Sequence, residues 1–147
     1  MPIKEDSIFF TVIPIDPVAW ARTRGDGKVR FKAKHLRKYQ EAIQLTVEDA
    51  YEGEPLSGPL AIGLTFIRKR PQKKPKMISK KAWGTGSMLF YPGVPDIDNL
   101  IKAILDAVNK TSLWHDDAQV VSVSATKNYA ESNGSPRIVF TVAQLED

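Results

Sequence analysis

The strongest constraint on the fold of this chain is a regular alternation of side chains along residues 59–67. Large apolar residues occupy every second position there, and smaller residues lie between them. A period of two places the large residues on one face of a strand, which predicts a strand that packs on one side only. Residues 7–15, 118–129 and 137–145 are rich in β-branched and aromatic residues and are bounded by prolines or turn residues, so we predict three further strands there.

Two other segments repeat their apolar residues at the spacing of a helix. Residues 34–51 carry apolar side chains every three or four positions and are followed by Gly53 and Pro55, which end helices. Residues 98–109 show one broad apolar side and form the second predicted helix. The order of elements favours an α+β class, with residues 1–147 as a single domain in which two helices pack against a mixed sheet of about four strands. The order of the strands within the sheet does not follow from this pattern.

The basic residues are unevenly distributed. Sixteen of the 21 lie in two segments, 22–38 and 68–81, while the net charge is only +4. Residues 68–95 also lack periodicity and are rich in proline and glycine, so we expect a flexible basic loop that faces DNA. The alternative is that both runs are ordinary solvated loops. If they bind phosphates, the best candidates are Arg22, Arg24, Arg30, Lys73, Lys74 and Lys76.

The composition excludes several classes of protein. The chain has no cysteine, so disulfides and thiolate metal sites are impossible, and zinc is disfavoured. The first ten residues carry acidic side chains where a signal peptide needs basic and then apolar ones, and no apolar run is long enough to span a membrane. We therefore expect a cytoplasmic protein without a membrane partner.

Five aspartates stand near the predicted helix and strand ends: Asp96, Asp98, Asp106, Asp116 and Asp117. The simplest interpretation is that Asp98 or Asn99 caps the second helix and that Asp98, Lys102 and Asp106 form a ladder of ion pairs one turn apart. We expect that role for Asp106. Capping needs only one carboxylate, however, and clustered acids repel one another unless a cation joins them.

A metal site explains the surplus of carboxylates. Oxygen ligands in a chain with two histidines and no cysteine favour Mg²⁺, with Mn²⁺ as a possible substitute. A calcium-binding loop that starts at Asp96 is excluded, because Ile101 and Ala107 stand where such a loop needs glycine and glutamate. Carboxylate-bound Mg²⁺ between basic segments suits the hydrolysis of phosphodiesters.

At these residues the chain resembles the RusA-like family of Holliday-junction resolvases. The resemblance rests on PDIDNLIKAILDAV from residue 95, WHDDAQVV from residue 114, and Lys127. It implies a homodimeric, Mg²⁺-dependent crossover-junction endodeoxyribonuclease of DNA recombination and repair that places symmetric nicks across four-way DNA junctions. It also implies that Asp96, Asp98 and Asp117 are metal-binding catalytic carboxylates, that Asp116 supports them in the metal site, and that Lys102 stabilises charge on the phosphate or orients the water.

Two other functions remain open from the sequence. The chain would be a non-catalytic DNA-binding accessory protein if its acids hold a structural ion, although Lys102 beside them argues for catalysis. A nucleotide hydrolase ranks last, because no glycine-rich phosphate loop is present. Trp83 and Tyr91 are candidates to stack on unpaired bases, Trp114 is expected in the core, and His115 is expected to be exposed.

Overall fold

The computed structural model describes residues 2–21 and 27–147, without the side chains of residues 5, 6 and 27–32. Its elements along the chain are β1 (Ile3–Ile13), α1 (Gly27–Ala50), β2 (Leu60–Arg68), α2 (Lys80–Gly84), β3 (Leu89–Phe90), α3 (Ile97–Val108), the 3-10 turn η1 (Asp117–Gln119), β4 (Val120–Tyr129) and β5 (Arg137–Leu145). The α+β class is confirmed. The described part holds five strands rather than four, because the two-residue β3 is too short to leave a periodic signal.

The strands form one mixed sheet in the order β1-β5-β2-β4-β3. β2 runs parallel to β4, and the other neighbouring pairs are antiparallel. A parallel pair cannot be joined by a tight turn, so the chain runs from β2 through α2, the short edge strand β3 and then α3 before it reaches β4. This crossover places the two ends of α3 near the two ends of β4.

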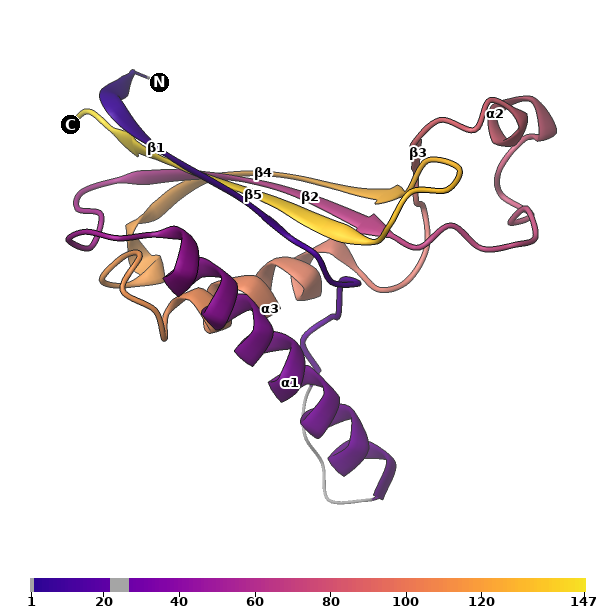
Figure 1. Cartoon of the computed structure of the whole chain (residues 1–147), viewed down its shortest axis with the longest axis horizontal. Helices are drawn as coiled ribbons and strands as arrows, with labels where there is room; N and C mark the ends of the chain where they lie inside the picture. The colour runs from indigo at the N-terminus through magenta and orange to yellow at the C-terminus, as the bar shows by residue number, and fades with distance from the viewer. Residues whose placement is uncertain (1, 22–26) are drawn as a thin grey trace.

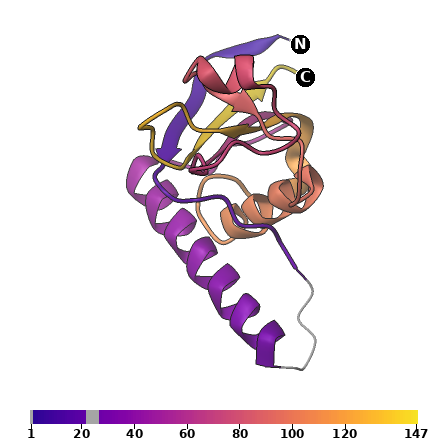
Figure 2. The same ribbon diagram turned by 90° about the vertical axis from the view of Figure 1, so that its right-hand side faces the viewer.

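Both long helices cover the same face of the sheet (Figures 1 and 2). The alternation along β2 is confirmed, since its larger apolar residues are buried toward these helices. The buried residues of β2 lie in one core with Ile43 and Val47 of α1 and Ile104 of α3. Trp114 belongs to the same core. Burial of apolar surface on one face of the sheet is the main stabilising term of this layer.

The helix α1 begins at Gly27, seven residues before the predicted start at residue 34. The predicted spacing is confirmed from Leu36 onward, where Leu36, Tyr39, Ile43 and Val47 are buried. The first turns of α1 extend beyond the sheet (Figure 1). The sequence of residues 27–33 does not follow the helical apolar spacing, which is why the sequence pattern missed this end.

Residues 69–95, called the arm below, project past the end of the sheet (Figure 1). The segment predicted as a flexible basic loop contains short regular elements. The arm contains α2 and β3, and its buried Ile78 and Tyr91 pack with Tyr129 of β4 in a second small core. Arg70 stacks at 3.9 Å over Trp83 and donates hydrogen bonds to three backbone carbonyls. These contacts stabilise the arm, although its sequence has no apolar periodicity.

Among the described helices, none combines the length and the apolar character that crossing a membrane requires.

Candidate active site

The carboxylates of Asp96 and Asp98, called the helix pair below, stand at the N-terminal end of α3. Asp96 is the N-cap residue in extended conformation, but its side chain makes no capping hydrogen bond. Asp98 lies in the first helical turn, where it accepts a hydrogen bond from the Asn99 N–H at 2.9 Å. The expected cap at Asp98 or Asn99 is therefore wrong by two or three residues. Both carboxylates are exposed, and the positive end of the helix dipole stabilises their charge.

Lys127 ties the end of β4 to the segment that carries the helix pair. Its ammonium donates hydrogen bonds to the carbonyls of Gly93 and Pro95, the latter at 2.9 Å. The entry to α3 is therefore fixed from the sheet as well as by the helix. This contact places the helix pair next to the C-terminal end of β4.

Lys102 lies one turn after Asp98, but it does not form the expected ion pairs. Its ammonium lies 3.8 Å from the centre of the Trp20 ring. The backbone N–H of Trp20 donates a hydrogen bond to the Asn99 carbonyl at 3.0 Å, which fixes the segment around Trp20 on α3. Within the described residues the only ion pair joins Glu131 to Arg137, so the ladder through Asp106 is not formed. Sequence reasoning missed Trp20, because no motif or spacing links it to α3.

Asp116 and Asp117, called the strand pair below, stand at the opposite end of β4. Asp116 caps the turn η1 by accepting from the Ala118 N–H at 3.2 Å. The side chain of Gln119 accepts from the Asp116 N–H at 3.0 Å and donates to the carbonyls of Leu56 and Gly58. The backbone of the strand pair is thus anchored on both sides. Asp117 is half-buried.

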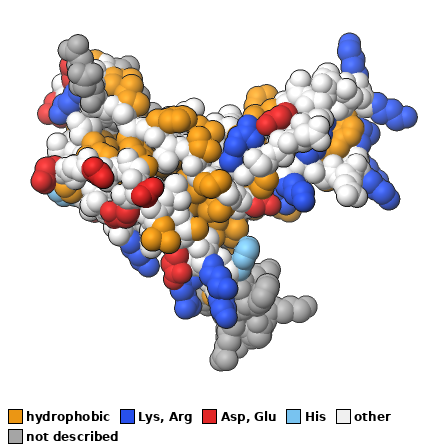
Figure 3. Space-filling view, viewed as in Figure 1, with side chains coloured by type: hydrophobic (Ala, Val, Ile, Leu, Met, Phe, Trp, Pro, Cys, Tyr) orange, Lys and Arg blue, Asp and Glu red, His pale blue; other side chains and the backbone are white. Residues whose placement is uncertain are grey.

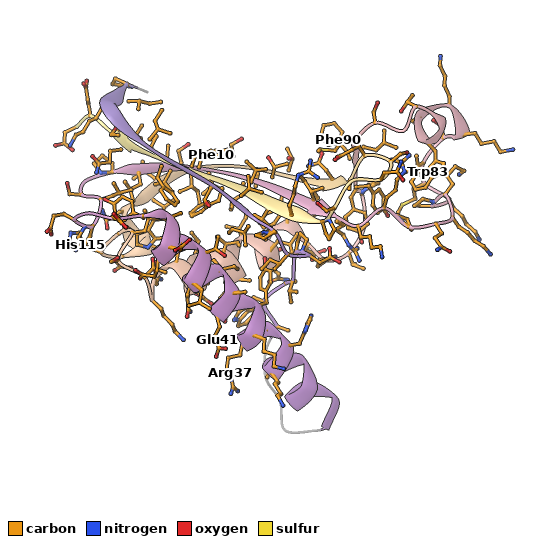
Figure 4. The ribbon with its side chains drawn as sticks, in the orientation of Figure 1. Phe10, Arg37, Glu41, Trp83, Phe90 and His115 are labelled. Carbon is orange, nitrogen blue, oxygen red and sulfur yellow. The ribbon has the colours of Figure 1, made fainter. Side chains whose placement is uncertain are left out.

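The two acidic pairs are far apart within one chain. The helix pair adjoins Lys127, whereas the strand pair precedes Val120, so about seven residues of β4 separate them, or roughly 23 Å at strand spacing. Figure 4 shows the same separation: His115, which precedes the strand pair, and Phe90, near the helix pair, lie at opposite ends of the sheet. In the described part of the chain, no three His, Asp or Glu residues come close enough to hold a metal ion together. The four predicted metal-binding aspartates therefore do not come together within one chain.

Each pair still has the chemistry of a Mg²⁺ site. Mg²⁺ is commonly held by one or two carboxylates, with water and substrate phosphate completing its shell. The helix pair offers two exposed carboxylates without an ion-pair partner among the described residues. The strand pair offers Asp117 and the remaining oxygen of Asp116. The donor sets therefore fit the ion, although one chain supplies only half of the predicted ligands at either place.

The predicted phosphate contacts divide into three groups. Lys73 and Lys76 are exposed on the arm, where Figure 3 shows basic side chains gathered. The ammonium of Lys74 donates to the carbonyls of Pro75 and Ile78, at 3.0 and 2.6 Å, and so stabilises the arm. Arg22 and Arg24, and the side chain of Arg30, lie outside the described residues.

The aromatic candidates mostly serve packing. Trp114 is buried in the main core, as expected, and His115 is exposed, as expected. Tyr91 is also buried, and Trp83 packs against the same small core of the arm with Arg70 over its ring. Tyr91 is therefore not available as an open platform for bases.

Comparison with known proteins adds two findings. A model of the family described as "Endodeoxyribonuclease RusA" matches residues 14–143. The chain is also 30% identical, over 144 residues, to "Uncharacterized protein YqaN" of Bacillus subtilis (strain 168), a match that covers 95% of this chain and 98% of that relative. The family match spans both acidic pairs, Lys102 and Lys127.

Proposed function

Because this chain belongs to the RusA endodeoxyribonuclease family, we propose that it is a Mg²⁺-dependent endonuclease that resolves Holliday junctions by paired symmetric nicks during DNA recombination and repair. The observation that carries the proposal is the helix pair. Two exposed carboxylates stand at a helix N-terminus, and the ammonium of Lys102 is held one turn away. A lysine beside the ligands does not help to hold a structural ion, whereas it stabilises the negative charge of a bound phosphodiester.

The residues have separate tasks in this reaction. Asp96 and Asp98 would hold the ion, which would lower the pKa of the attacking water and offset charge on the scissile phosphate. Lys102 neutralises charge that develops on the phosphate oxygens. Lys127 positions Asp96 through the Pro95 carbonyl. Trp20 positions Lys102, since it holds the ammonium over its ring.

The site becomes complete in a homodimer. One chain places the strand pair roughly 23 Å from the helix pair, at opposite ends of β4. A second copy related by a two-fold axis brings its own strand pair to the helix pair of the first, and the reverse holds at the other end. Two equivalent sites then face the two opposed strands of a junction, which has near two-fold symmetry itself.

The arm supplies the contact to the DNA backbone. Its exposed lysines, Lys73 and Lys76 among them, belong to a segment that projects past the end of the sheet where Lys127 fixes the helix pair. Such contacts are largely independent of sequence and weaken as salt rises. Lys74 contributes to this surface indirectly, because its ammonium holds the arm together.

The direct test is cleavage of a synthetic four-way junction with each strand end-labelled in turn. With Mg²⁺ we expect nicks at symmetric positions in two opposed strands, and none with EDTA. Asp98→Asn abolishes cleavage and leaves junction binding intact, whereas the matched control Asp106→Asn, on the same helix, cuts like the wild type. Junctions that are bound but remain intact with both Mg²⁺ and Mn²⁺ would instead favour the accessory DNA-binding protein.

A further inference from the structure

The segment that leads into the helix pair is irregular, yet its backbone is bound at three successive residues. Lys127 donates hydrogen bonds to the carbonyls of Gly93 and Pro95. Between them, Nη1 of Arg68 donates to the carbonyl of Val94 at 3.3 Å. Carbonyls in an irregular segment are commonly bound by water instead. Two side chains of the sheet therefore fix the course of the chain immediately before the helix pair.

The strands β2 and β4 bring these two cations to one place. They run parallel, with Phe66 in register with Lys127, and Phe66 is buried on the helix-covered face of the sheet. Arg68 follows Phe66 by two residues and so points to the same face. Both cations thus stand near the C-terminal ends of neighbouring strands, at the end of the sheet from which the arm projects (Figure 1).

Tyr91 lies at the centre of this arrangement. Its hydroxyl accepts a hydrogen bond from Nη1 of Arg68, and its N–H donates to the Lys127 carbonyl at 2.9 Å. The guanidinium of Arg68 and the ammonium of Lys127 lie 4.7 and 5.1 Å from the centre of its ring. Gly93 also packs against it, since a Cβ atom there would stand 3.2 Å from three atoms of the Tyr91 side chain. Arg68, Tyr91 and Lys127 are called the clamp below.

The clamp donates its side-chain hydrogen bonds to neutral groups. Among the described residues, neither Arg68 nor Lys127 forms an ion pair with the helix pair. The acceptors are three backbone carbonyls and the Tyr91 hydroxyl. A cation paired with the carboxylates would compete with a metal ion for them. The clamp instead orders the backbone and leaves both carboxylates to the ion.

We propose that Arg68 and Tyr91 are positioning residues for the metal site, which act with Lys127 to hold Asp96 in place through the backbone of the three residues before it. The inference rests on the proposed function for the role of Asp96 as a metal ligand. Groups that orient a metal ligand directly contribute about 10- to 100-fold to metal affinity. Because the clamp acts through the backbone, we expect an effect of about tenfold, the lower end of that range.

The first test measures the order of the segment without metal or DNA. In the wild type, NMR relaxation should give the amides of Gly93, Val94 and Asp96 order parameters of about 0.85, and Arg68→Met should lower them to below about 0.6. The control Arg37→Met removes the same charge from an exposed position on α1 and should change nothing (Figure 4). Low values in the wild type, or equal values in Arg68→Met and the wild type, overturn the proposal.

The second test measures Mn²⁺ binding to the folded protein by electron paramagnetic resonance. Loss of a nearby positive charge by itself would strengthen the binding of a cation, whereas loss of the clamp weakens it. We therefore expect Arg68→Met to bind Mn²⁺ about tenfold more weakly than the wild type, and Arg37→Met to match the wild type. Tyr91→Phe keeps the ring and loses only the hydroxyl, so its affinity should lie between the two. Equal or tighter binding by Arg68→Met overturns the positioning role.

The two tests separate positioning from other roles of Arg68. A purely structural contribution would lower the melting temperature of Arg68→Met but leave the Mn²⁺ affinity of its folded form unchanged, and that result also overturns the inference. A wild type that binds no Mn²⁺ overturns the metal site of the proposed function, and with it the role given to Arg68 there. Wild-type binding that Arg68→Met leaves unchanged overturns this inference alone. Neither test uses cleavage.

Discussion

The contact between Lys102 and Trp20 is the feature of single residues with the clearest consequence for activity. The ammonium lies 3.8 Å from the ring centre, and the backbone of Trp20 is fixed to Asn99. A cation over an aromatic ring at an exposed position contributes about 0.5–1 kcal/mol. The contact therefore holds Lys102 near the helix pair without neutralising its charge, as an ion pair with Asp98 would.

Loss of the Trp20 ring should weaken catalysis modestly. We expect Trp20→Leu to lower the single-turnover cleavage rate by about two- to fivefold, in line with the energy of the contact, and to leave junction affinity unchanged. Trp20→Phe keeps a ring and retains most of the rate. The upfield ring-current shift of the Lys102 side-chain protons should vanish in Trp20→Leu and persist in Trp20→Phe. A shift that is absent from the wild type would contradict the contact.

Individual residues were predictable where spacing alone decides their place. The positions of Asp96 and Asp98 at the start of a helix follow from Pro95 and the apolar run after them. The partner of Lys102 was not predictable, because Trp20 reaches it through the fold and not through a helical repeat. The helix cap was predicted at the wrong residue, because Asp96 begins the helix although its side chain makes no capping hydrogen bond.

At the scale of elements, Lys127 connects β4 to the start of α3. Two hydrogen bonds to backbone carbonyls fix the segment before Asp96. Lys127→Met removes both, and we expect cleavage to fall about thirtyfold as Asp96 loses its position, since two bonds of about 1 kcal/mol each amount to about 2 kcal/mol. Hydrogen exchange along residues 93–96 should rise in this variant. Lys110→Met, in an exposed position after α3, is the control, and unchanged exchange in Lys127→Met would refute the role of Lys127.

The turn between β4 and β5 should give the fold a weak dependence on pH. The pKa of Glu131 lies below its ordinary value of 4.5, chiefly because of a hydrogen bond from its own backbone and then because of Arg137. A lowered pKa in the folded state means that the stabilisation is present above the unfolded value and is lost as pH falls through the folded value.

This dependence is measurable by urea unfolding of the wild type and Glu131→Gln. The variant should be less stable at neutral pH, and the difference should shrink as the pH falls below about 4, where the carboxylate of the wild type takes up a proton. Because the side chain of Glu131 is 40% exposed, solvent screens its charge and the difference is expected to be small. A difference that stays constant down to acid pH would show that the carboxylate charge is not its cause.

Elements were predictable where burial imposes a period. The strand β5 and the helix α3 lie within one residue of their predicted bounds, because each has one buried side. The arm was not predictable, since its order comes from Arg70 stacked on Trp83 and from carbonyls bound by Lys74. Such contacts join basic side chains to an aromatic ring and to backbone carbonyls, so they leave no apolar repeat in the sequence.

At the scale of the whole molecule, the distance between the two acidic pairs decides how an active site can be assembled. The sequence places Asp98 and Asp117 nineteen residues apart and suggests one cluster. In the fold, α3 lies on one face of the sheet and runs in the opposite direction to β4. Asp98 at the start of α3 and Asp117 at the start of β4 therefore lie at opposite ends of the sheet (Figure 1). This separation depends on topology, which a motif does not contain.

Complementation between two inactive variants shows directly whether two copies share one active site. Asp98→Asn and Asp117→Asn are each expected to be inactive alone. When differently tagged copies are co-expressed and the mixed dimer is purified through both tags, one of its two sites combines the intact Asp98 of one copy with the intact Asp117 of the other. We expect this mixed dimer to nick one strand of a four-way junction in the presence of Mg²⁺. A mixed dimer that stays inactive while the wild type cuts would contradict a site shared between two copies.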